Sequence, residues 1–400
     1  MKKNNAGATL IELLVGIGLM FLVATVISQV FLSTRQQVQT QEALARIQEN
    51  GRQALYHLNT DVRMAGFIGP VQQYWKVAET TNTPRRIGTI TDECFTATGG
   101  NSFRWIAPMA AVSPLRLPPR VFGKDNTRVD FEGCIDSSNY VTNTDVLSVH
   151  YAALPRIANS ALVEDVVYLR SNIFGAALFE CNTSGGAGVA CLNGALNTGT
   201  FPIGDDLWGN VGTPDPTPET ANYPIFAAVY YVRPCTDTGA NDVCDAGVDD
   251  DVPTLVRARI EYNTANCNPT SRPCVVHEPI ATGVVSFQVE YGLDSAVESG
   301  VTPIGTVNGA YRAGLPDGYV DRYVPASAID GGSLFSDDAL EMWTNVLTVR
   351  IWLLIRTDMK EAGYTPKLTQ FDLAGESINA EGTYRHQLFT STIAIRNLAG

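Results

Sequence analysis

The hydrophobic pattern of the chain begins with one long apolar run close to the N-terminus. Residues 8–32 are apolar apart from a single charge, Glu12, and a short leader that contains Lys2 and Lys3 precedes them. A run of this length is sufficient to span a bilayer, and the two lysines orient the leader towards the cytoplasm. A carboxylate at the centre of a membrane helix costs about 2.5–3.5 kcal/mol on insertion scales. Glu12 is therefore expected to have a partner or a function.

The apolar run continues into an amphipathic segment with helical spacing. Apolar residues recur at steps of three, four and seven, at Val38, Leu44, Ile47, Ala54, Leu55, Leu58 and Val62. The opposite face carries polar and charged residues, namely Gln36, Gln37, Glu42, Arg46, Glu49, Arg52 and Asp61. No proline occurs before Pro70, and Gly66 provides a C-cap. The pattern predicts one helix over residues 8–66, membrane-spanning at about 8–32 and amphipathic at about 33–64.

After the helix, the pattern changes to the period of two that is typical of strands. Alternating or short apolar runs predict strands at residues 146–151, 163–169, 227–232, 255–262, 285–291, 347–356 and 389–397. The strand at 347–356 has a second face that is only partly polar, which indicates a central strand. Residues 175–224 are rich in Gly, Asn, Thr and Pro and are expected to form a long loop. We therefore predict an α+β fold in which a long N-terminal helix packs on an antiparallel sheet in a β-rich head at residues 67–400.

The charge composition of the chain limits the kinds of molecule that it is expected to bind. The chain has 400 residues, a formal net charge of −13 and a sequence pI of about 4.8. This acidic balance argues against a nucleic-acid partner, which would require a basic footprint. It agrees with a globular head outside the cytoplasm.

Eight cysteines give the next constraint. They are Cys94, Cys134, Cys181, Cys191, Cys235, Cys244, Cys267 and Cys274. No C-x-x-C spacing occurs, which disfavours zinc-ribbon and thioredoxin-like sites. In an exported chain, paired cysteines form disulfides, although sequence alone leaves their connectivity open. Cys235–Cys244 and Cys267–Cys274 would each close one loop between predicted strands, so long disulfide-linked loops are expected.

Catalytic chemistry finds little support in the sequence. The four histidines are scattered, and His277-Glu278 lacks the spacing of a zinc-protease motif. No G-x-S-x-G motif and no phosphate-binding loop occur. Acidic loops at 249–251 and 316–321 carry possible calcium ligands, but neither has EF-hand spacing. We therefore expect no catalytic residue, no metal site and no cofactor, and we interpret both loops as solvated.

The residues around Glu12 resemble the class III signal of type IV prepilins. That signal has a short positive leader ending in Gly, a cut after the Gly, and Glu as the fifth residue of the mature chain. The resemblance implies cleavage by a prepilin peptidase between Gly7 and Ala8, N-methylation of Ala8, and a role of Glu12 in assembly. Ala8 departs from the family pattern, which usually has Phe or Met there. An ordinary secretory signal is disfavoured, because no A-x-A-like site follows the apolar run.

Further segments resemble the PilW-type minor pilins. These are Q-E-N-G-R-Q-A-L at 48–55, D-V-R-M-A-G-F at 61–67, V-S-F-Q-V-E-Y-G-L-D at 285–294, L-T-V-R-I-W-L-L-I-R at 347–356 and T-S-T-I-A-I-R-N at 390–397. The resemblance covers the first 70 residues closely and the last 120 or so in patches. It implies a pilin-like fold and a structural protein that joins other minor pilins and the major pilin.

The same resemblance implies a function and a location. The protein would prime type IV pilus assembly and lie at the pilus tip. It would first span the inner membrane once with a periplasmic head, and then belong to an extracellular pilus of a Gram-negative bacterium. Two alternatives remain open. One is a pseudopilin of type II secretion, and the other is a pilus-tip adhesin carried on the same helix.

Overall fold

A computed structural model describes residues 10–70, 119–129, 131–158, 161–163, 167–171, 176–180, 221–239, 243–245, 247–261, 274–294, 318–330, 342–361, 363–380 and 382–396. The chain forms two compact units, Met1–Glu49 and Asn50–Gly400. The long helix contributes its first part to one unit and its last turns to the other. The predicted boundaries after residues 7 and 66 stay predictions.

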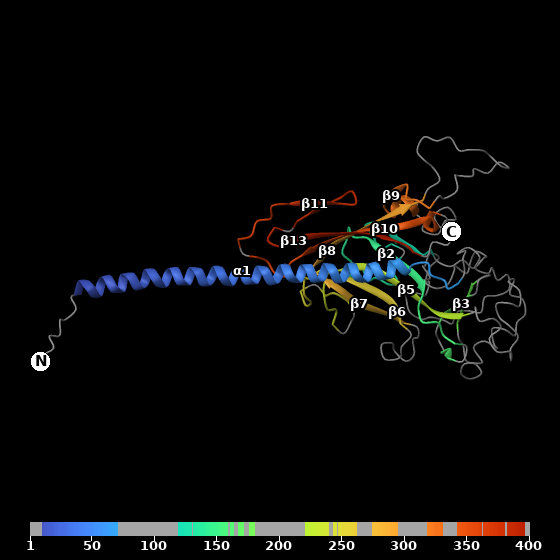
Figure 1. The fold of residues 1–400 in the computed structure, drawn as a ribbon, viewed down its shortest axis with the longest axis horizontal. Coiled ribbons are helices and arrows are strands. Elements are labelled where there is room, and N and C mark those ends of the chain that lie inside the picture. The colour runs from blue at the N-terminus through green and yellow to red at the C-terminus, as the bar shows by residue number, and fades with distance from the viewer. Residues whose placement is uncertain are drawn as a thin grey trace, which may run out of the picture. The chain divides into compact units, whose positions relative to one another are not determined.

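The helix α1, Leu10–Met64, is continuous, as the hydrophobic pattern predicts (Figure 1). Its C-terminal end is set by Gly66, which has a φ of +74°. A side chain there would be strained, and its Cβ would lie 2.4 Å from the Arg120 side chain. The Gly66 amide donates to the carbonyl of His150 at 2.9 Å. The predicted C-cap is thus in place and connects the helix end to the neighbouring sheet.

In the described part of the chain, the first sheet has seven antiparallel strands and is built around β5. Its strands are β1 Val121–Lys124, β2 Val146–Ala152, β3 Val167–Ser171, β4 Ala176–Glu180, β5 Ala221–Arg233, β6 Thr254–Glu261 and β7 Cys274–Thr282. The strand order is β1-β2-β5-β3-β4, and β6 pairs with both β5 and β7. Because the 13-residue β5 pairs with β2, β3 and β6, it is the central strand. The 3₁₀ helix η1, Ser137–Asn139, lies between β1 and β2.

The second sheet has four antiparallel strands in the order β13-β10-β8-β9. Its strands are β8 Val284–Leu293, β9 Arg322–Val324, β10 Val346–Arg356 and β13 His386–Ala394, and a separate hairpin pairs β11 Gln370–Leu373 with β12 Glu376–Asn379. The short helix α3, Ser327–Asp330, follows β9. Gly283 alone separates β7 from β8 and has a φ of +79°. A Cβ at this position would lie 2.4 Å from the backbone oxygen of Arg356, so glycine is required where the chain passes between the sheets.

The core joins the two sheets to the last turns of α1. Ala54, Leu58 and Val62 are completely buried. Trp343 is also completely buried, and its ring lies 4.7 Å from that of Tyr291, centroid to centroid. Large apolar side chains of the helix and the sheets are thus buried together, and their removal from water stabilises the head.

Most predicted strands are found within one to three residues of their expected ends, but two expectations were wrong. β5 begins six residues earlier than the predicted strand. β7 was assigned to a loop, whereas the structure starts a strand at Cys274 and pairs it with Glu261 of β6. The predicted strand at 163–169 is described only from Val167 onwards. The described residues of the head form two sheets and a hairpin rather than a single sheet.

The solvent exposure of β8 also differs from the prediction. The alternation indicates a half-buried strand with Ser286 and Gln288 facing water, yet each is only 1% exposed. The Gln288 amide donates to the carbonyl of Asn143 at 3.0 Å. This bond satisfies a buried polar group. The second face of β8 is therefore covered by the segment that precedes β2.

Asp145, just before β2, joins the two sheets. Its amide donates to the Phe287 carbonyl at 2.9 Å. Its carboxyl oxygens accept from the amides of Asn126 at 2.9 Å and Val289 at 2.7 Å. The residue is 3% exposed. Burial is the main effect on its titration and raises the pKa of Asp145 from 3.8 to about 8, with Asp125 and Glu376 adding to the rise and the two amides opposing it.

This carboxyl predicts a pH dependence of stability. Above pH 3.8 the unfolded chain releases the proton that the folded chain retains up to about pH 8. The free energy of unfolding should therefore fall as the pH rises through this range, by at most about 1.4 kcal/mol per pH unit. Asp145→Asn keeps the shape and should flatten the dependence, as measured by urea unfolding between pH 5 and 8. An unchanged slope in the variant would contradict this assignment.

Candidate functional site

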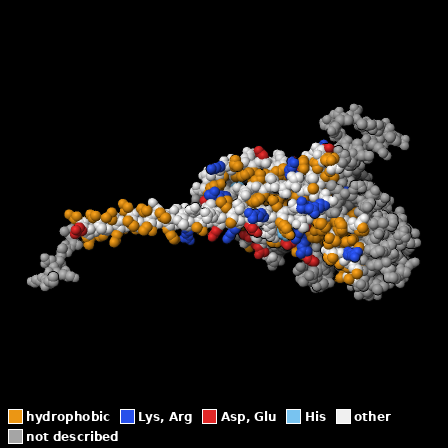
Figure 2. Space-filling view, in the orientation of Figure 1, with side chains coloured by type: hydrophobic (Ala, Val, Ile, Leu, Met, Phe, Trp, Pro, Cys, Tyr) orange, Lys and Arg blue, Asp and Glu red, His pale blue; other side chains and the backbone are white. Residues whose placement is uncertain are grey.

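The N-terminal part of α1 is an exposed apolar helix. By length and composition, α1 is the one described helix that could cross a membrane. Side chains along residues 10–32 are exposed, and Figure 2 shows hydrophobic atoms along this part of the helix. Glu12 lies in the first turn. Gly7 and Ala8 fall outside the described residues, so cleavage and methylation stay predictions.

The last turns of α1 contact both β13 of the second sheet and the end of β7 in the first sheet. A Cβ on Gly51 would lie 2.4 Å from the ring of Phe389 in β13, so the ring packs against the bare helix backbone. The side-chain amide of Asn50 donates to the carbonyl of Thr282 at 3.0 Å and to its hydroxyl at 2.8 Å. Gly51, a weak point by helix propensity, is therefore a packing position.

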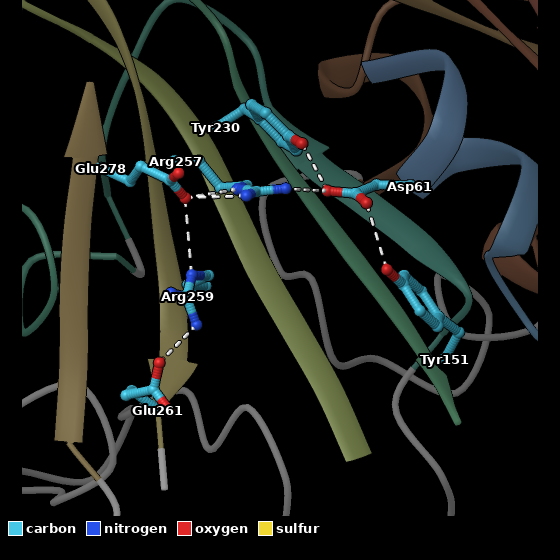
Figure 3. A network of polar contacts seen from close by, with 7 residues as sticks. All are labelled: Asp61, Tyr151, Tyr230, Arg257, Arg259, Glu261 and Glu278. Carbon is cyan, nitrogen blue, oxygen red and sulfur yellow. Dashed lines mark hydrogen bonds and ion pairs between the residues drawn. The ribbon is translucent and has the colours of Figure 1, made fainter. Parts of the chain in front are cut away.

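On the side of the first sheet, the helix ends in a network of polar contacts around Asp61 (Figure 3). The Asp61 network comprises Asp61, Tyr151, Tyr230, Arg257, Arg259, Glu261 and Glu278. Asp61 is 3% exposed. Its carboxylate accepts from the hydroxyls of Tyr151 at 3.1 Å and Tyr230 at 2.5 Å, and from Nη1 of Arg257 at 3.1 Å. The last turns of the helix are thereby bound to β2, β5 and β6.

The network continues outwards along the sheet. Arg257 also donates to Glu278 of β7, with Nη2 at 2.7 Å from Oε2. Arg259 reaches the same oxygen at 3.4 Å and pairs with Glu261 at 2.8 Å. The Glu278 side chain is 39% exposed, whereas that of Asp61 is 4% exposed. Arg257 therefore connects a buried carboxylate to a solvated one.

The electrostatics maintain this arrangement of donors and acceptors. Burial, with the negative charge of Asp61, raises the pKa of the Tyr230 and Tyr151 hydroxyls, so both remain donors. Burial opposes the charge of Arg257, but its acidic partners outweigh this and raise the pKa of its guanidinium. Partial burial would raise the pKa of Glu278, yet the bonds and charges of Arg257 and Arg259 lower it. The geometry suits attachment of the helix rather than chemistry on a substrate.

The position of Asp61 corrects the sequence analysis. Asp61 was assigned to the polar face of the helix, whereas the structure buries it. Its neighbours in sequence, Leu58 and Val62, belong to the apolar stripe, and this proximity was the available signal. The partners of Asp61 lie on strands far along the chain, so no local motif indicates them.

The cysteines are described only in part. Cys235 and Cys244 form a disulfide with a Cα–Cα distance of 5.8 Å, and Cys134 is also disulfide-bonded. Cys94, Cys181, Cys191 and Cys267 lie outside the described residues, as does the side chain of Cys274. The predicted pairing of Cys267 with Cys274 and the wider set of disulfide-linked loops thus stay predictions.

The Cys235–Cys244 loop should contribute measurably to stability. Double replacement by Ser is expected to lower the free energy of unfolding by roughly 2.5–3 kcal/mol, since a loop of this length loses that much closure entropy in the chain-entropy model. Urea unfolding of the full chain under oxidising conditions measures this. Wild-type protein under reducing conditions should show a loss at least as large, and an unchanged stability of the double variant would contradict the expectation.

Carboxylates of the acidic loop at 249–251 accept hydrogen bonds from backbone amides. Asp250 accepts from the amides of Thr236 and Val252, and Asp249 accepts from that of Asp245. Within the described ranges, no group of three or more His, Cys, Asp or Glu residues is placed to hold a metal ion. Part of the acidic segment at 316–321 lies outside those ranges.

Comparison with protein families gives a match in the second half of the chain. The family model described as Type IV Pilus-assembly protein W, PilW, matches residues 229–397. The matched region runs from the C-terminal part of β5 to the end of β13 and includes Arg257, Glu278 and Phe389. No curated protein and no solved structure matches the chain.

The apolar helix and the family match both indicate a protein of the cell envelope. The exposed apolar helix suggests membrane anchoring, and the family match suggests a location in the cell envelope and contact with other pilus components. The matched region includes β6 and β13, two of the strands that contact the last turns of the helix, but not β2. The match supports a PilW-like type IV pilus family for this chain and indicates involvement in type IV pilus assembly.

Proposed function

We propose that the protein is a minor pilin that primes type IV pilus assembly and lies at the pilus tip. The main support is that the PilW match falls on strands that hold the end of a helix with a membrane-length apolar segment. A pilin needs both parts, because its apolar helix resides in the membrane before assembly and among other helices afterwards. The proposal assigns the protein no catalytic role and no cofactor.

The route to the pilus follows from this proposal. The chain spans the inner membrane of a Gram-negative bacterium once, with the head in the periplasm, and then joins other minor pilins and the major pilin. The decisive experiment is mass spectrometry of the sheared pilus fraction, reporting both the presence of the protein and its N-terminus. Presence with an N-terminus at Ala8 is the expected result, and absence from sheared pili would contradict the proposal.

Processing can be tested separately. Gly7→Leu should leave the leader attached, because a prepilin peptidase cuts after this small residue. The intact mass of the membrane form measures this, and Asn5→Leu, which leaves the junction unchanged, is the control. A mature N-terminus at Ala8 in the Gly7 variant would refute processing at this site.

The alternatives differ in location and in phenotype. A type II secretion pseudopilin would be found in a short periplasmic rod and not in sheared surface pili. A tip adhesin would be dispensable for assembly, so a deletion strain would form normal pili that fail to attach. A minor pilin with a priming role predicts that deletion lowers the number of pili.

A further inference from the structure

We propose that the outer edge of β13 is a docking site for an extended strand of a neighbouring pilus subunit, which extends the four-stranded sheet in the antiparallel sense. This inference rests on the proposed function, because it assigns the partner to the pilus. The β13 edge is defined by the backbone groups of Leu388, Thr390, Thr392 and Ala394.

The hydrogen bonds of β13 fix which backbone groups point outwards. The amide of Ile395 donates to the carbonyl of Leu347 at 2.9 Å, and the carbonyl of Arg385 accepts from the amide of Thr357 at 2.9 Å. In an antiparallel pair, the residues that face the partner alternate. Odd-numbered residues of β13 therefore face β10, and the amides and carbonyls of even-numbered residues point away from it.

No strand in the described part of the chain pairs with these outward groups. β13 is the terminal strand in the order β13-β10-β8-β9. Leu388 is 38% exposed, and Thr390, Thr392 and Ala394 are exposed as well. Among the described residues, no backbone hydrogen bond reaches the amide or carbonyl of these four. The edge thus offers a row of alternating donors and acceptors, which is the template that an added strand requires.

The composition of β13 distinguishes it from the other described edges. Residues 386–394 contain no Asp, Glu, Lys, Arg or Pro. Proteins usually protect sheet edges with short strands, charges or proline. β1, β4 and β9 are short, at four, five and three residues, and β7 is interrupted by Pro279. The chain has a net charge of −13, yet this long edge is neutral and therefore suits an uncharged partner strand. The exposed threonines of β13 can form favourable cross-strand pairs with threonines of that strand.

The direction of β13 decides between a second copy and another subunit. The ring of Phe389 packs against Gly51, and the amide of Arg396 donates to the carbonyl of Arg63 at 3.4 Å. β13 therefore runs alongside the helical residues 50–64 and in the same direction. An antiparallel pair of two β13 edges would point these helical segments in opposite directions. Two copies whose 50–64 segments run parallel therefore cannot pair through their β13 edges, and the proposal assigns this edge to an extended strand of a different subunit.

Substitution at an outward amide tests the proposal. Thr392→Pro removes an amide that donates to nothing within the sheet, but it blocks an added strand. The amount of full-length protein in sheared pili relative to the membrane pool should fall at least about tenfold. Thr392→Val keeps the amide and the branched shape and should match wild type. Urea unfolding of both purified full-length variants in detergent shows whether the head is intact, and Thr390→Lys blocks the edge by charge if the proline variant is unstable.

The outcomes separate this proposal from the function on which it rests. Normal incorporation of stably folded Thr392→Pro and Thr390→Lys would overturn the docking site and leave the minor-pilin role standing. Absence of the wild type from sheared pili would overturn both. A disulfide-linked homodimer of Thr390→Cys in assembled pili would show that a second copy is the occupant, contrary to the direction argument.

Discussion

Replacement of Asp61 by alanine is expected to lower the free energy of unfolding by about 3 kcal/mol or more. The change removes the shared acceptor of Tyr151, Tyr230 and Arg257, and both hydroxyls and one guanidinium nitrogen lose their partner away from water. Loss of one member of a buried ion pair costs about 3–5 kcal/mol. Because Arg257 keeps Glu278, the lower end of this range is expected. Urea unfolding of the full chain in detergent measures the effect.

The same network provides a matched control. Glu278→Ala removes the other carboxylate of Arg257, but this group is 39% exposed, and exposed ion pairs contribute about 0–1 kcal/mol. Each variant deletes one carboxylate partner of Arg257; they differ in burial and in the two tyrosine hydrogen bonds that only Asp61 accepts. Equal losses for Asp61→Ala and Glu278→Ala would mean that the buried attachment of the helix has no special energetic role.

The regular elements were predictable where one period dominates a segment. α1 follows from an apolar run that continues into steps of three and four, and β6 and β10 follow from clean alternation. β10 carries mixed residues on its second face, and its central position between β13 and β8 confirms the prediction drawn from that mixture. Hydrophobic periodicity reports which face is buried, and in these elements burial follows it.

The prediction of strands failed where strand pairing, rather than the local residue pattern, determines the structure. β5 extends through Pro224, a residue that usually excludes an internal strand position. Pro224 pairs with Tyr168 of β3, and the next residue, Ile225, pairs with Ala152 of β2. The proline thus lies where the partner strand changes. β7 contains Pro279 and polar residues, and only its register with β6 reveals it as a strand.

The polar attachment of the helix was hidden for the same reason. Asp61 binds two tyrosines and an arginine that the register of β2, β5 and β6 brings together. That register cannot be inferred from the spacing of residues in the sequence. The β13 edge is different. Its neutral composition is visible in the sequence, but which of its amides point outwards depends on the pairing with β10. Sequence therefore predicted the elements, and the structure was needed to place their functional groups.

The largest effect on assembly is expected from Glu12. Once a peptidase removes the leader, Ala8 carries a free amino group, and Glu12 lies four residues further along the same helical face, about 6 Å along the axis. In a low dielectric, a carboxylate without a counter-charge is strongly disfavoured, whereas a paired one is tolerated. In a bundle of staggered helices, Glu12 of one subunit can meet the amine of a neighbour. The carboxylate would then favour the one axial register in which that amine arrives at its depth.

Glu12→Ala should therefore insert in the membrane and be cut after Gly7, yet enter pili at least about tenfold less than wild type. A factor of ten corresponds to about 1.4 kcal/mol, and the free energy lost with one charge pair inside the helix bundle is larger than this. Glu12→Asp keeps the charge and should recover part of the loss, whereas Glu12→Gln keeps the shape and should not. Quantitative mass spectrometry of sheared pili and of the membrane fraction from the same cells gives both incorporation and processing. If fully processed Glu12→Ala is incorporated normally, the carboxylate lies at the membrane interface without setting the register.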